Sequence, residues 1–347
     1  MIWKPQKLQK ILFVENVLSK IEIYLTSLPR WIFFPITSIV FIFINVRPYA
    51  RNHLIMNYST NILAGESLPK PVNFTSSNLL PAIIYRVFDI NADDYSAQAS
   101  SRIYVALLIS LTVFTYLFFI FAISKLPTQR NRRFLTIVFV FLPMHRFLAP
   151  PFDVYDIFIY FGIAVMIYGL VTQNHLNSFF IGSFMFIFSH PEQALASFAA
   201  LFLLSLNKNF QFLTKLAIKS LLFAILTNFS VHIWYYLYGY RDARAIEIIF
   251  GFFPITLPGH ITHPYDSVMT ILKMYGMLWI LVFFSLKLFS EKLEEKSLLS
   301  ISIIGAPFFF WFVTSDGLRC VVPMTTLLSL ILAFTLTTKE IQTPKLR

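Results

Sequence analysis

The stretch FIFSHPEQALASF, residues Phe186–Phe198, places a His-Pro-Glu-Gln cluster inside a long apolar run, Phe179–Leu206. Read as one continuous helix, this run would carry Glu192 near the middle of a membrane. A charged side chain at that depth costs about 3 kcal/mol or more. A break in the helix near Glu192 avoids most of this cost.

The residue types at the cluster also favour a break. Pro191 has no amide hydrogen, and its ring disfavours a helical conformation at the preceding residue, His190. The sequence therefore predicts two short helices, residues 178–190 and 193–206, that meet at a polar tip.

The composition of the whole chain indicates a membrane protein. Hydrophobic residues make up 57% of it and charged residues 13%, with a mean hydropathy of +0.68, which excludes an ordinary soluble domain. Because about 20 helical residues cross a bilayer, the apolar runs predict an all-α, polytopic transmembrane helix bundle of about ten spans, with a range of about nine to eleven. The predicted spans are 31–46, 103–123, 134–148, 154–172, 178–190, 193–206, 217–237, 268–286, 298–314 and 319–337.

The distribution of charge predicts the orientation. With both termini on the cytoplasmic side, 18 of the 28 Lys and Arg residues lie in cytoplasmic segments and 11 of the 17 acidic residues lie on the opposite side. The net charge of +11 is therefore interpreted as a topology signal, and we expect no nucleic-acid partner.

One membrane domain accounts for nearly the whole chain. Residues 1–30 are predicted to form a cytoplasmic or interfacial amphipathic segment, residues 31–337 the transmembrane domain, and residues 338–347 a cytoplasmic tail. The two long outer loops are residues 47–102 and 238–267, and the first is expected to contain two short interfacial helices, with a merely structural loop as the alternative.

Acidic residues near the outer ends of the spans are candidates for proton transfer. Asp156 lies one turn inside the span that begins at residue 154, and Glu192 lies at the break. Each has a catalytic or ligand-binding interpretation, and for Asp156 an ion pair with Arg146 is the structural alternative.

Basic residues on the same side are candidates for binding a phosphate, because a guanidinium group pairs well with phosphate oxygens. Arg241 and Arg244 lie in the second long loop, and pairing with nearby acids is their structural alternative. Asp316 and Arg319 flank the start of the last span, where the Arg319 side chain either reaches into the same groove or extends to the membrane surface.

The order of these features resembles the GT-C superfamily of polyprenyl-phosphate-sugar-dependent glycosyltransferases. The resemblance rests on the long first outer loop with LLP at Leu79–Pro81, YD at Tyr155–Asp156, the break at His190–Glu192, and GLR at Gly317–Arg319, which is followed by Pro323. It covers most of the chain as architecture and short motifs, none of which is specific alone.

The resemblance implies a glycosyltransferase that takes a hexosyl or pentosyl group from a polyprenyl-phosphate carrier and passes it to an envelope glycan, lipid or protein on the non-cytoplasmic side of a bacterial inner membrane. In this family an acidic residue of the first outer loop usually acts as the base, but here no Asp or Glu lies between Arg47 and Gly65. Either His53 serves, or Glu66, Asp156 or Glu192 does, or transfer activity has been lost.

The resemblance also bears on binding residues, cofactors and partners. The predicted substrate-binding residues are Arg319, Arg241, Arg244, Arg146, His190 and Asp316. No cofactor is required, although a divalent cation, Mg²⁺ or Mn²⁺, can replace arginine charge, and no metal ligand set is predicted. The expected partners are membrane lipids, the lipid-linked sugar donor and a glycan or lipid acceptor.

Three other functions stay open for this sequence. They are a lipid-glycan polymerase or ligase, a transporter or flippase, and a non-catalytic membrane subunit.

Overall fold

The computed structural model describes residues 28–45, 97–142, 154–172, 176–237, 264–289, 293–313 and 317–342. These residues form helices and contain no strand, as the all-α prediction requires. The α-helices are α2 (Arg30–Asn45), α5 (Ala97–Ser124), α6 (Gln129–Val140), α7 (Val154–Thr172), α8 (Leu176–Ser189), α9 (Pro191–Ser205), α10 (Thr214–Leu237), α13 (Pro264–Tyr275), α14 (Trp279–Leu288), α15 (Leu293–Ser300), α16 (Ala306–Val313) and α17 (Gly317–Gln342). Two short 3-10 helices, η4 (Lys208–Leu213) and η6 (Gly276–Leu278), and one π-helix, η7 (Ile301–Gly305), complete them.

Every predicted span overlaps at least one of these helices, and the bounds of α7 coincide with the predicted range. Three stretches of the described residues are long and apolar enough to cross a membrane by themselves: Lys208–Ser230, Val268–Leu288 and Val321–Thr338. The protein is therefore helical with three candidate membrane spans, and the number of about ten spans stays a prediction.

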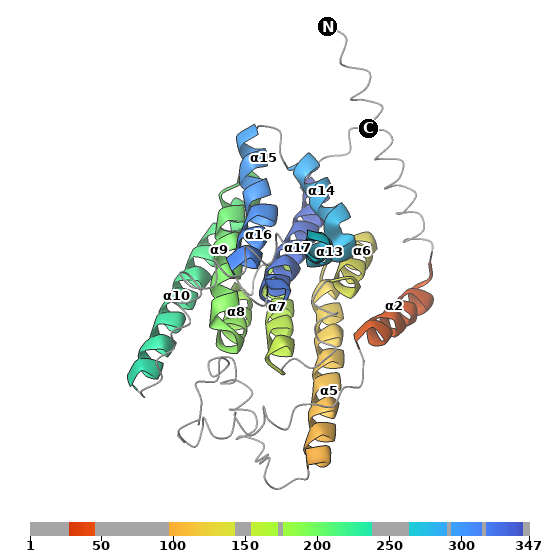
Figure 1. Cartoon of the computed structure of the whole chain (residues 1–347). Helices are drawn as coiled ribbons and strands as arrows, with labels where there is room; N and C mark the ends of the chain where they lie inside the picture. Colours follow the sequence, from red (N-terminus) through yellow and green to blue (C-terminus); the bar gives the residue numbers. More distant parts are fainter. Residues whose placement is uncertain are drawn as a thin grey trace.

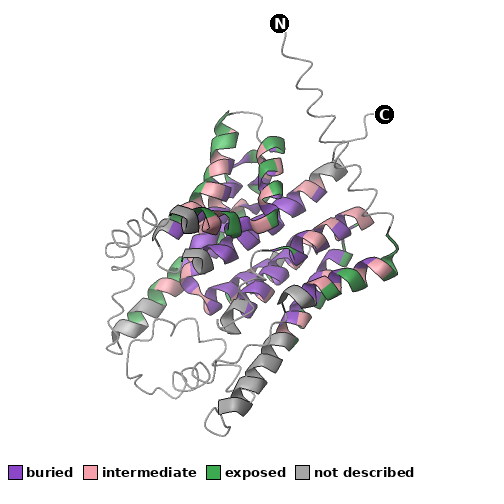
Figure 2. Cartoon of the chain, turned by 45° about the vertical axis from the view of Figure 1, so that its right-hand side comes forward, coloured by how far each residue is buried: buried purple, intermediate pink, exposed green. Residues whose placement is uncertain are grey.

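Helix α17 lies at the centre of the bundle (Figure 1). Its side chains from Val321 to Thr335 are all buried, and it packs against α9, α13 and α16. Figure 2 shows buried residues gathered in the interior and exposed ones on the outer helices. The outer faces carry large apolar side chains, which suits contact with lipid. On α2 and α10 these include Trp31, Ile36, Ile39, Leu222, Ile225, Leu226 and Phe229.

The predicted break at His190 is confirmed. Helix α8 ends at Ser189, α9 begins at Pro191, and His190 is the one non-helical residue between them, with φ −156° and ψ 88°. The ring centres of Phe186 and Phe198 lie 5.7 Å apart, whereas a continuous helix would separate these residues by about 18 Å. The chain therefore turns back on itself at this point.

The bounds predicted for the third span, 134–148, are wrong at both ends. Helix α6 begins at Gln129, because Thr128 caps it by accepting a hydrogen bond from the Asn131 amide at 3.3 Å. Its first turns therefore contain the basic residues that were assigned to a loop, since Arg is a good helix former. Phe141 ends the helix in a non-helical conformation. Helix α5 also begins earlier than predicted, at Ala97.

The span predicted over residues 268–286 is not one continuous helix. Gly276 adopts a positive φ of 54°, and the 3-10 turn η6 separates α13 from α14. Two side chains donate hydrogen bonds to carbonyl oxygens next to this break. The Thr325 hydroxyl donates to the Met274 carbonyl oxygen at 2.8 Å, and the Trp279 indole N–H donates to the Ile271 carbonyl oxygen at 3.2 Å. The irregular backbone is thus tolerated inside the bundle.

A second irregular turn lies beside the first. The π-helix η7 interrupts the span formed by α15 and α16, and the Tyr275 hydroxyl donates to the carbonyl oxygen of Ile303 within it. A π-helical turn widens the backbone and is frequent at functional sites. Tyr275 therefore links the broken α13–α14 span to the π-helix.

Two predicted features lie outside the described residues almost entirely. These are the amphipathic segment 1–30, of which only residues 28–30 are described, and the interfacial helices of the first outer loop. At the other end, α17 continues to Gln342, beyond the predicted start of the cytoplasmic tail.

Candidate functional site

The turn between α8 and α9 brings three polar side chains to one point of the bundle. His190 precedes the helix, Pro191 occupies its first position, and Glu192 and Gln193 complete the first turn. Proline suits that position because its missing amide hydrogen would have no partner within the helix. The dipole of α9 favours a negative charge at Glu192. His190 and Glu192 are half-buried, whereas Gln193 is 2% exposed.

Gln193 stands out because its amide is unused. A Gln at this position commonly bonds back to the amide of the residue before the helix, but the His190 amide donates instead to the Phe186 carbonyl oxygen at 3.0 Å. Within the described structure neither the Gln193 amide nitrogen nor its oxygen has a hydrogen-bond partner. The side chain therefore keeps its capacity to donate two hydrogen bonds and to accept others.

Two hydroxyl groups of α17 share this property. Thr326 and Ser329 are both 0% exposed, and their hydroxyls have no partner among the described residues. In an apolar helix, Ser and Thr usually bond a carbonyl oxygen of the preceding turn. Several buried residues here do so: Ser183, Ser197, Ser302, Thr335 and Thr337. Thr326 and Ser329 depart from that pattern.

Helices α9 and α17, which carry these groups, pack together. The ring of Phe212, in η4 just after α9, lies 6.4 Å from that of Phe334 on α17, so this end of α9 lies near Phe334. At 1.5 Å per residue, Gln193 lies about 18 Å along α9 from its last residue, and Thr326 about 12 Å along α17 from Phe334. The unused amide and hydroxyls therefore lie on two helices that pack together, and their distances from this end differ by about one to two helical turns.

The structure describes the side chains of only two predicted site residues, His190 and Glu192. Asp156 lies in the first turn of α7 and Arg319 in the first turn of α17, but their side chains lie outside the description. The other predicted residues fall outside the described ranges altogether: His53, Arg146, Arg241, Arg244 and Asp316. Whether Asp156 and the arginines face the break stays a prediction.

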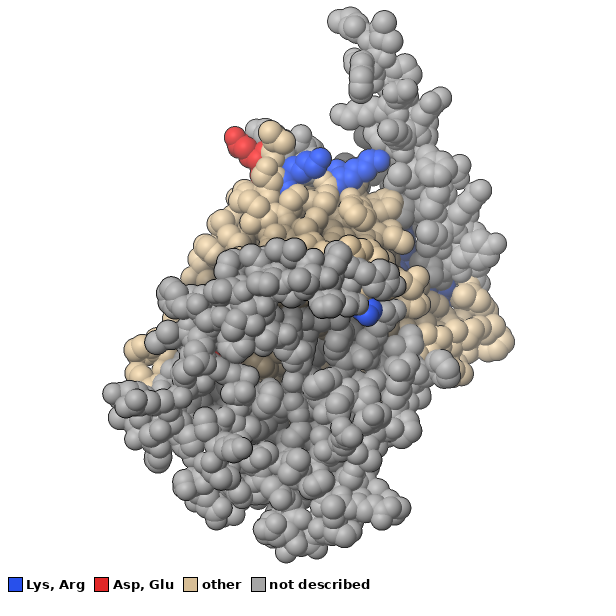
Figure 3. All heavy atoms as spheres, viewed as in Figure 1, with Lys and Arg blue, Asp and Glu red and all other residues tan. Residues whose placement is uncertain are grey.

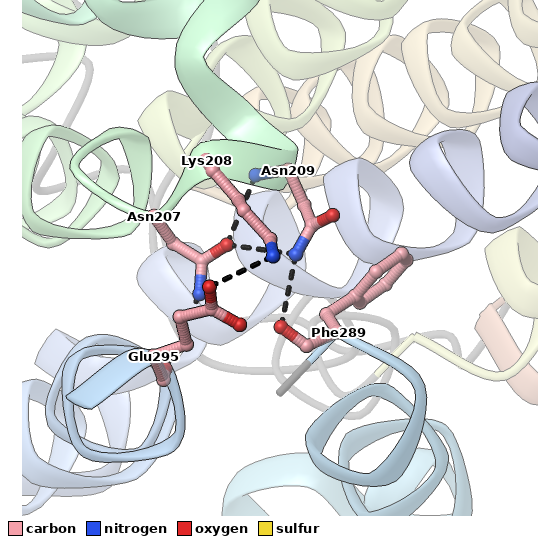
Figure 4. A network of polar contacts seen from close by, with 5 residues as sticks. All are labelled: Asn207, Lys208, Asn209, Phe289 and Glu295. Atoms are coloured by element: carbon pink, nitrogen blue, oxygen red, sulfur yellow. Dashed lines mark hydrogen bonds and ion pairs between the residues drawn. The ribbon is translucent and has the colours of Figure 1, made fainter. Parts of the chain in front are cut away.

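A second polar cluster joins η4 to α14 and α15 (Figure 4). Asn207 donates from its amide to the Glu295 carbonyl oxygen at 3.2 Å and accepts from the backbone and side-chain amides of Asn209 at 3.0 and 2.9 Å. Asn209 donates in turn to the Phe289 carbonyl oxygen at 2.9 Å, and Lys208 pairs with Glu295 at 2.9 Å. These bonds hold three segments together, so we assign the cluster a structural role.

Positive charge gathers at that same end of the bundle. On the face drawn in Figure 3, most visible Lys and Arg atoms lie where α14 and α15 end the bundle. The basic residues near the helix ends on that side of the bundle include Lys125, Arg130, Arg132, Lys208, Lys215, Lys287 and Lys296. The break at His190 is separated from this end by the length of α9.

Arg133 fixes α2 against α6. It is 1% exposed, its guanidinium donates to the Leu28 carbonyl oxygen at 2.5 Å, and it lies 5.0 Å from the centre of the Phe33 ring. Its contacts are those of a structural residue.

Gln193, Thr326 and Ser329 were not among the predicted site residues. The only signal in the sequence was the position of Gln193 next to Glu192. Within the described residues, no group of three or more His, Cys, Asp or Glu side chains is placed to hold a metal ion. Comparison of the chain with models of protein families, with curated proteins and with solved structures finds no match.

Proposed function

We propose that this protein is a membrane glycosyltransferase that moves a sugar from a polyprenyl-phosphate carrier to a glycan, lipid or protein acceptor on the non-cytoplasmic side of the membrane. The observation that carries the proposal is the turn at His190, which holds a carboxylate, an imidazole and a buried amide at one point inside an apolar bundle. Such a group of polar side chains within a mostly apolar site is typical of substrate binding.

The reaction needs a base and a site for a leaving phosphate. In the proposed step, the Glu192 carboxylate takes the proton of an acceptor hydroxyl while that oxygen attacks the anomeric carbon of the donor sugar. The bond between that carbon and the phosphate oxygen breaks, and its electron pair leaves with the polyprenyl phosphate. In this proposal, His190 binds the acceptor or the phosphate.

Positive charge has to accompany the leaving phosphate. Arg319, at the start of α17, is the proposed partner, with Arg241 or Arg244 of the second outer loop as further candidates. A bound Mg²⁺ or Mn²⁺ would supply the same charge.

The proposed orientation follows from the charges at the two ends of the bundle. The basic end formed around η4, α14 and α15 is assigned to the cytoplasm, because Lys and Arg are enriched there in membrane proteins. The turn at His190 then faces the opposite side. We propose a bacterial inner membrane with both termini cytoplasmic, in keeping with the resemblance described above.

A transporter is the second candidate, and the irregular helices favour it. Discontinuous spans often bind substrate in transporters, because the broken backbone exposes polar groups. Here the breaks at His190 and Gly276 and the π-helix Ile301–Gly305 interrupt three neighbouring parts of the bundle. A transporter would move its substrate across sealed vesicles without forming a covalent bond.

The test is a transfer assay on the full chain in nanodiscs, with labelled polyprenyl-phosphate-linked sugars as donors. We expect Glu192→Gln to reduce label incorporation by about 10²-fold or more. Glu295→Gln is the matched control, because Glu295 lies in the structural cluster of Figure 4 and should leave incorporation within about two-fold of the wild type. Equal incorporation by wild type and Glu192→Gln would remove Glu192 as the base, and uptake without incorporation would favour transport.

A further inference from the structure

Four buried neutral side chains have no hydrogen-bond partner among the described residues: Ser285 on α14, Gln193 on α9, and Thr326 and Ser329 on α17. We propose that Gln193, Thr326 and Ser329, which lie on two helices that pack together, form a recognition site for the hydroxyl groups of a sugar. This inference rests on the proposed function, whose substrate it specifies, and it assigns to these residues the binding of the sugar rather than of the phosphate.

The chemistry of the three side chains selects the ligand class. An amide donates two hydrogen bonds and accepts through its oxygen, and each hydroxyl both donates and accepts. A sugar hydroxyl has the same dual character, so neighbouring hydroxyls can satisfy an amide on both sides. None of the three groups is charged, so they offer no counter-ion to a phosphate, which must be bound elsewhere.

The three groups make no hydrogen bond within the described structure, whereas polar side chains next to them do. The Ser197 hydroxyl, one turn after Gln193 on the same helix, donates to the Gln193 carbonyl oxygen at 2.7 Å, which satisfies it within the helix. Thr325, next to Thr326, caps the Met274 carbonyl oxygen at the break in α13–α14. The two neighbours have structural partners, while Gln193 and Thr326 do not.

The three groups lie on two helices that pack against each other. The distances of Gln193 and Thr326 from the Phe212–Phe334 contact differ by about one helical turn, and Ser329 follows Thr326 by about one turn on the same face of α17. Helix α9 also packs against the π-helix η7, so irregular backbone borders the same region. Buried polar groups that have no protein partner usually bond a ligand or ordered water, and we propose that a sugar takes this role here.

The experiment measures sugar binding without transfer. The full chain in nanodiscs is heated with octyl β-D-glucopyranoside, or with octyl tetraethylene glycol ether, which has the same alkyl chain and no sugar, both below their micellar concentrations. We expect the glucoside to raise the unfolding midpoint of the wild type more than the ether does, because a ligand that binds only the folded state stabilises it. Titration of the midpoint gives an apparent affinity.

Substitutions then locate the site. Gln193→Met keeps the length of the side chain without its polar atoms, and Thr326→Val keeps the shape of threonine. Each should fold at least as well as the wild type and weaken glucoside binding about ten-fold or more. Ser197→Ala is the matched control on α9 and should bind the glucoside as the wild type does.

The possible outcomes separate the two proposals. An equal response to glucoside and ether, or a glucoside response that Gln193→Met and Thr326→Val both retain, would overturn the sugar site and leave water as the occupant. Glucoside binding that depends on Gln193, in a wild type that transfers no sugar from any labelled carrier, would keep the sugar site and remove the transferase. Transfer that needs Glu192 and is insensitive to Gln193→Met would keep the transferase and remove the sugar site.

Discussion

Gly162 on α7 and Gly182 on α8 face each other where these two helices pack together. A Cβ atom on Gly162 would lie 2.7 Å from the Gly182 carbonyl oxygen, and one on Gly182 would lie 2.7 Å from the Met166 amide nitrogen and still closer to the Gly162 carbonyl oxygen. Small residues that allow backbones to approach in this way stabilise helix pairs in membranes, where lipid is as apolar as the side chains.

Because backbone atoms cannot move aside, Gly182→Ala should lower the free energy of unfolding by about 1–3 kcal/mol. The measurement is an unfolding titration with SDS in mixed micelles. Gly305→Ala is the control, because the nearest atoms to its added Cβ belong to Ile301 at 3.8 Å, an ordinary contact. Similar midpoints for Gly182→Ala and the wild type would mean that α7 and α8 pack less closely than described.

Gly276 is required for a different reason. Its φ of 54° is unfavourable for a residue with a Cβ, yet nothing lies within 4 Å of the added atom. Gly276→Ala should therefore cost about 1–2 kcal/mol through backbone strain alone. Gly276→Asn should cost less, since Asn tolerates this conformation better. The same SDS titration checks the order, and an Ala variant as stable as the wild type would contradict the positive φ.

The sequence predicted the parts of the fold that depend on local pattern. Every described α-helix overlaps a predicted apolar span, although several bounds differ, and Pro191 next to Glu192 was enough to predict the turn at His190. These features follow from side-chain hydropathy and backbone chemistry, which are written in neighbouring residues.

Features that depend on distant residues were missed. Gly276 is a single glycine in an apolar run, and its break is tolerated because Thr325, on a helix far along the chain, caps the Met274 carbonyl oxygen. The Gly162–Gly182 contact likewise needs two helices in register. In the candidate site, Glu192 was selected for its charge, whereas the unused amide of Gln193 is recognised only when all its neighbours are known.

Thr325 gives a direct test of how the broken span is stabilised. Thr325→Val removes a hydroxyl that bonds the Met274 carbonyl oxygen, and we expect a loss of about 1–2 kcal/mol of unfolding free energy, because a buried carbonyl is left without a partner. Thr335→Val is the matched control on the same helix. Its hydroxyl bonds the Ile331 carbonyl oxygen at 2.9 Å, one turn earlier, and its loss should cost about 0.6 kcal/mol or less. Equal losses in an SDS titration would show that the break needs no cap.

The cluster of Figure 4 separates the contribution of a buried amide from that of an ion pair. Asn207 is 1% exposed, and Asn207→Ala removes its hydrogen bonds with the Asn209 amides and the Glu295 carbonyl oxygen, so it should cost about 1–3 kcal/mol. The Lys208 side chain is 50% exposed, and water screens its pair with Glu295. Lys208→Met should therefore cost about 1 kcal/mol or less, and less still at high salt.

Unfolding titrations of both variants at low and high salt make the comparison. A larger, salt-dependent loss for Lys208→Met than for Asn207→Ala would mean that charge attraction holds η4 to α15. The expected order instead assigns that role to the amide of Asn207, because a buried group that loses its partners pays its full desolvation cost, whereas an exposed ammonium group regains water.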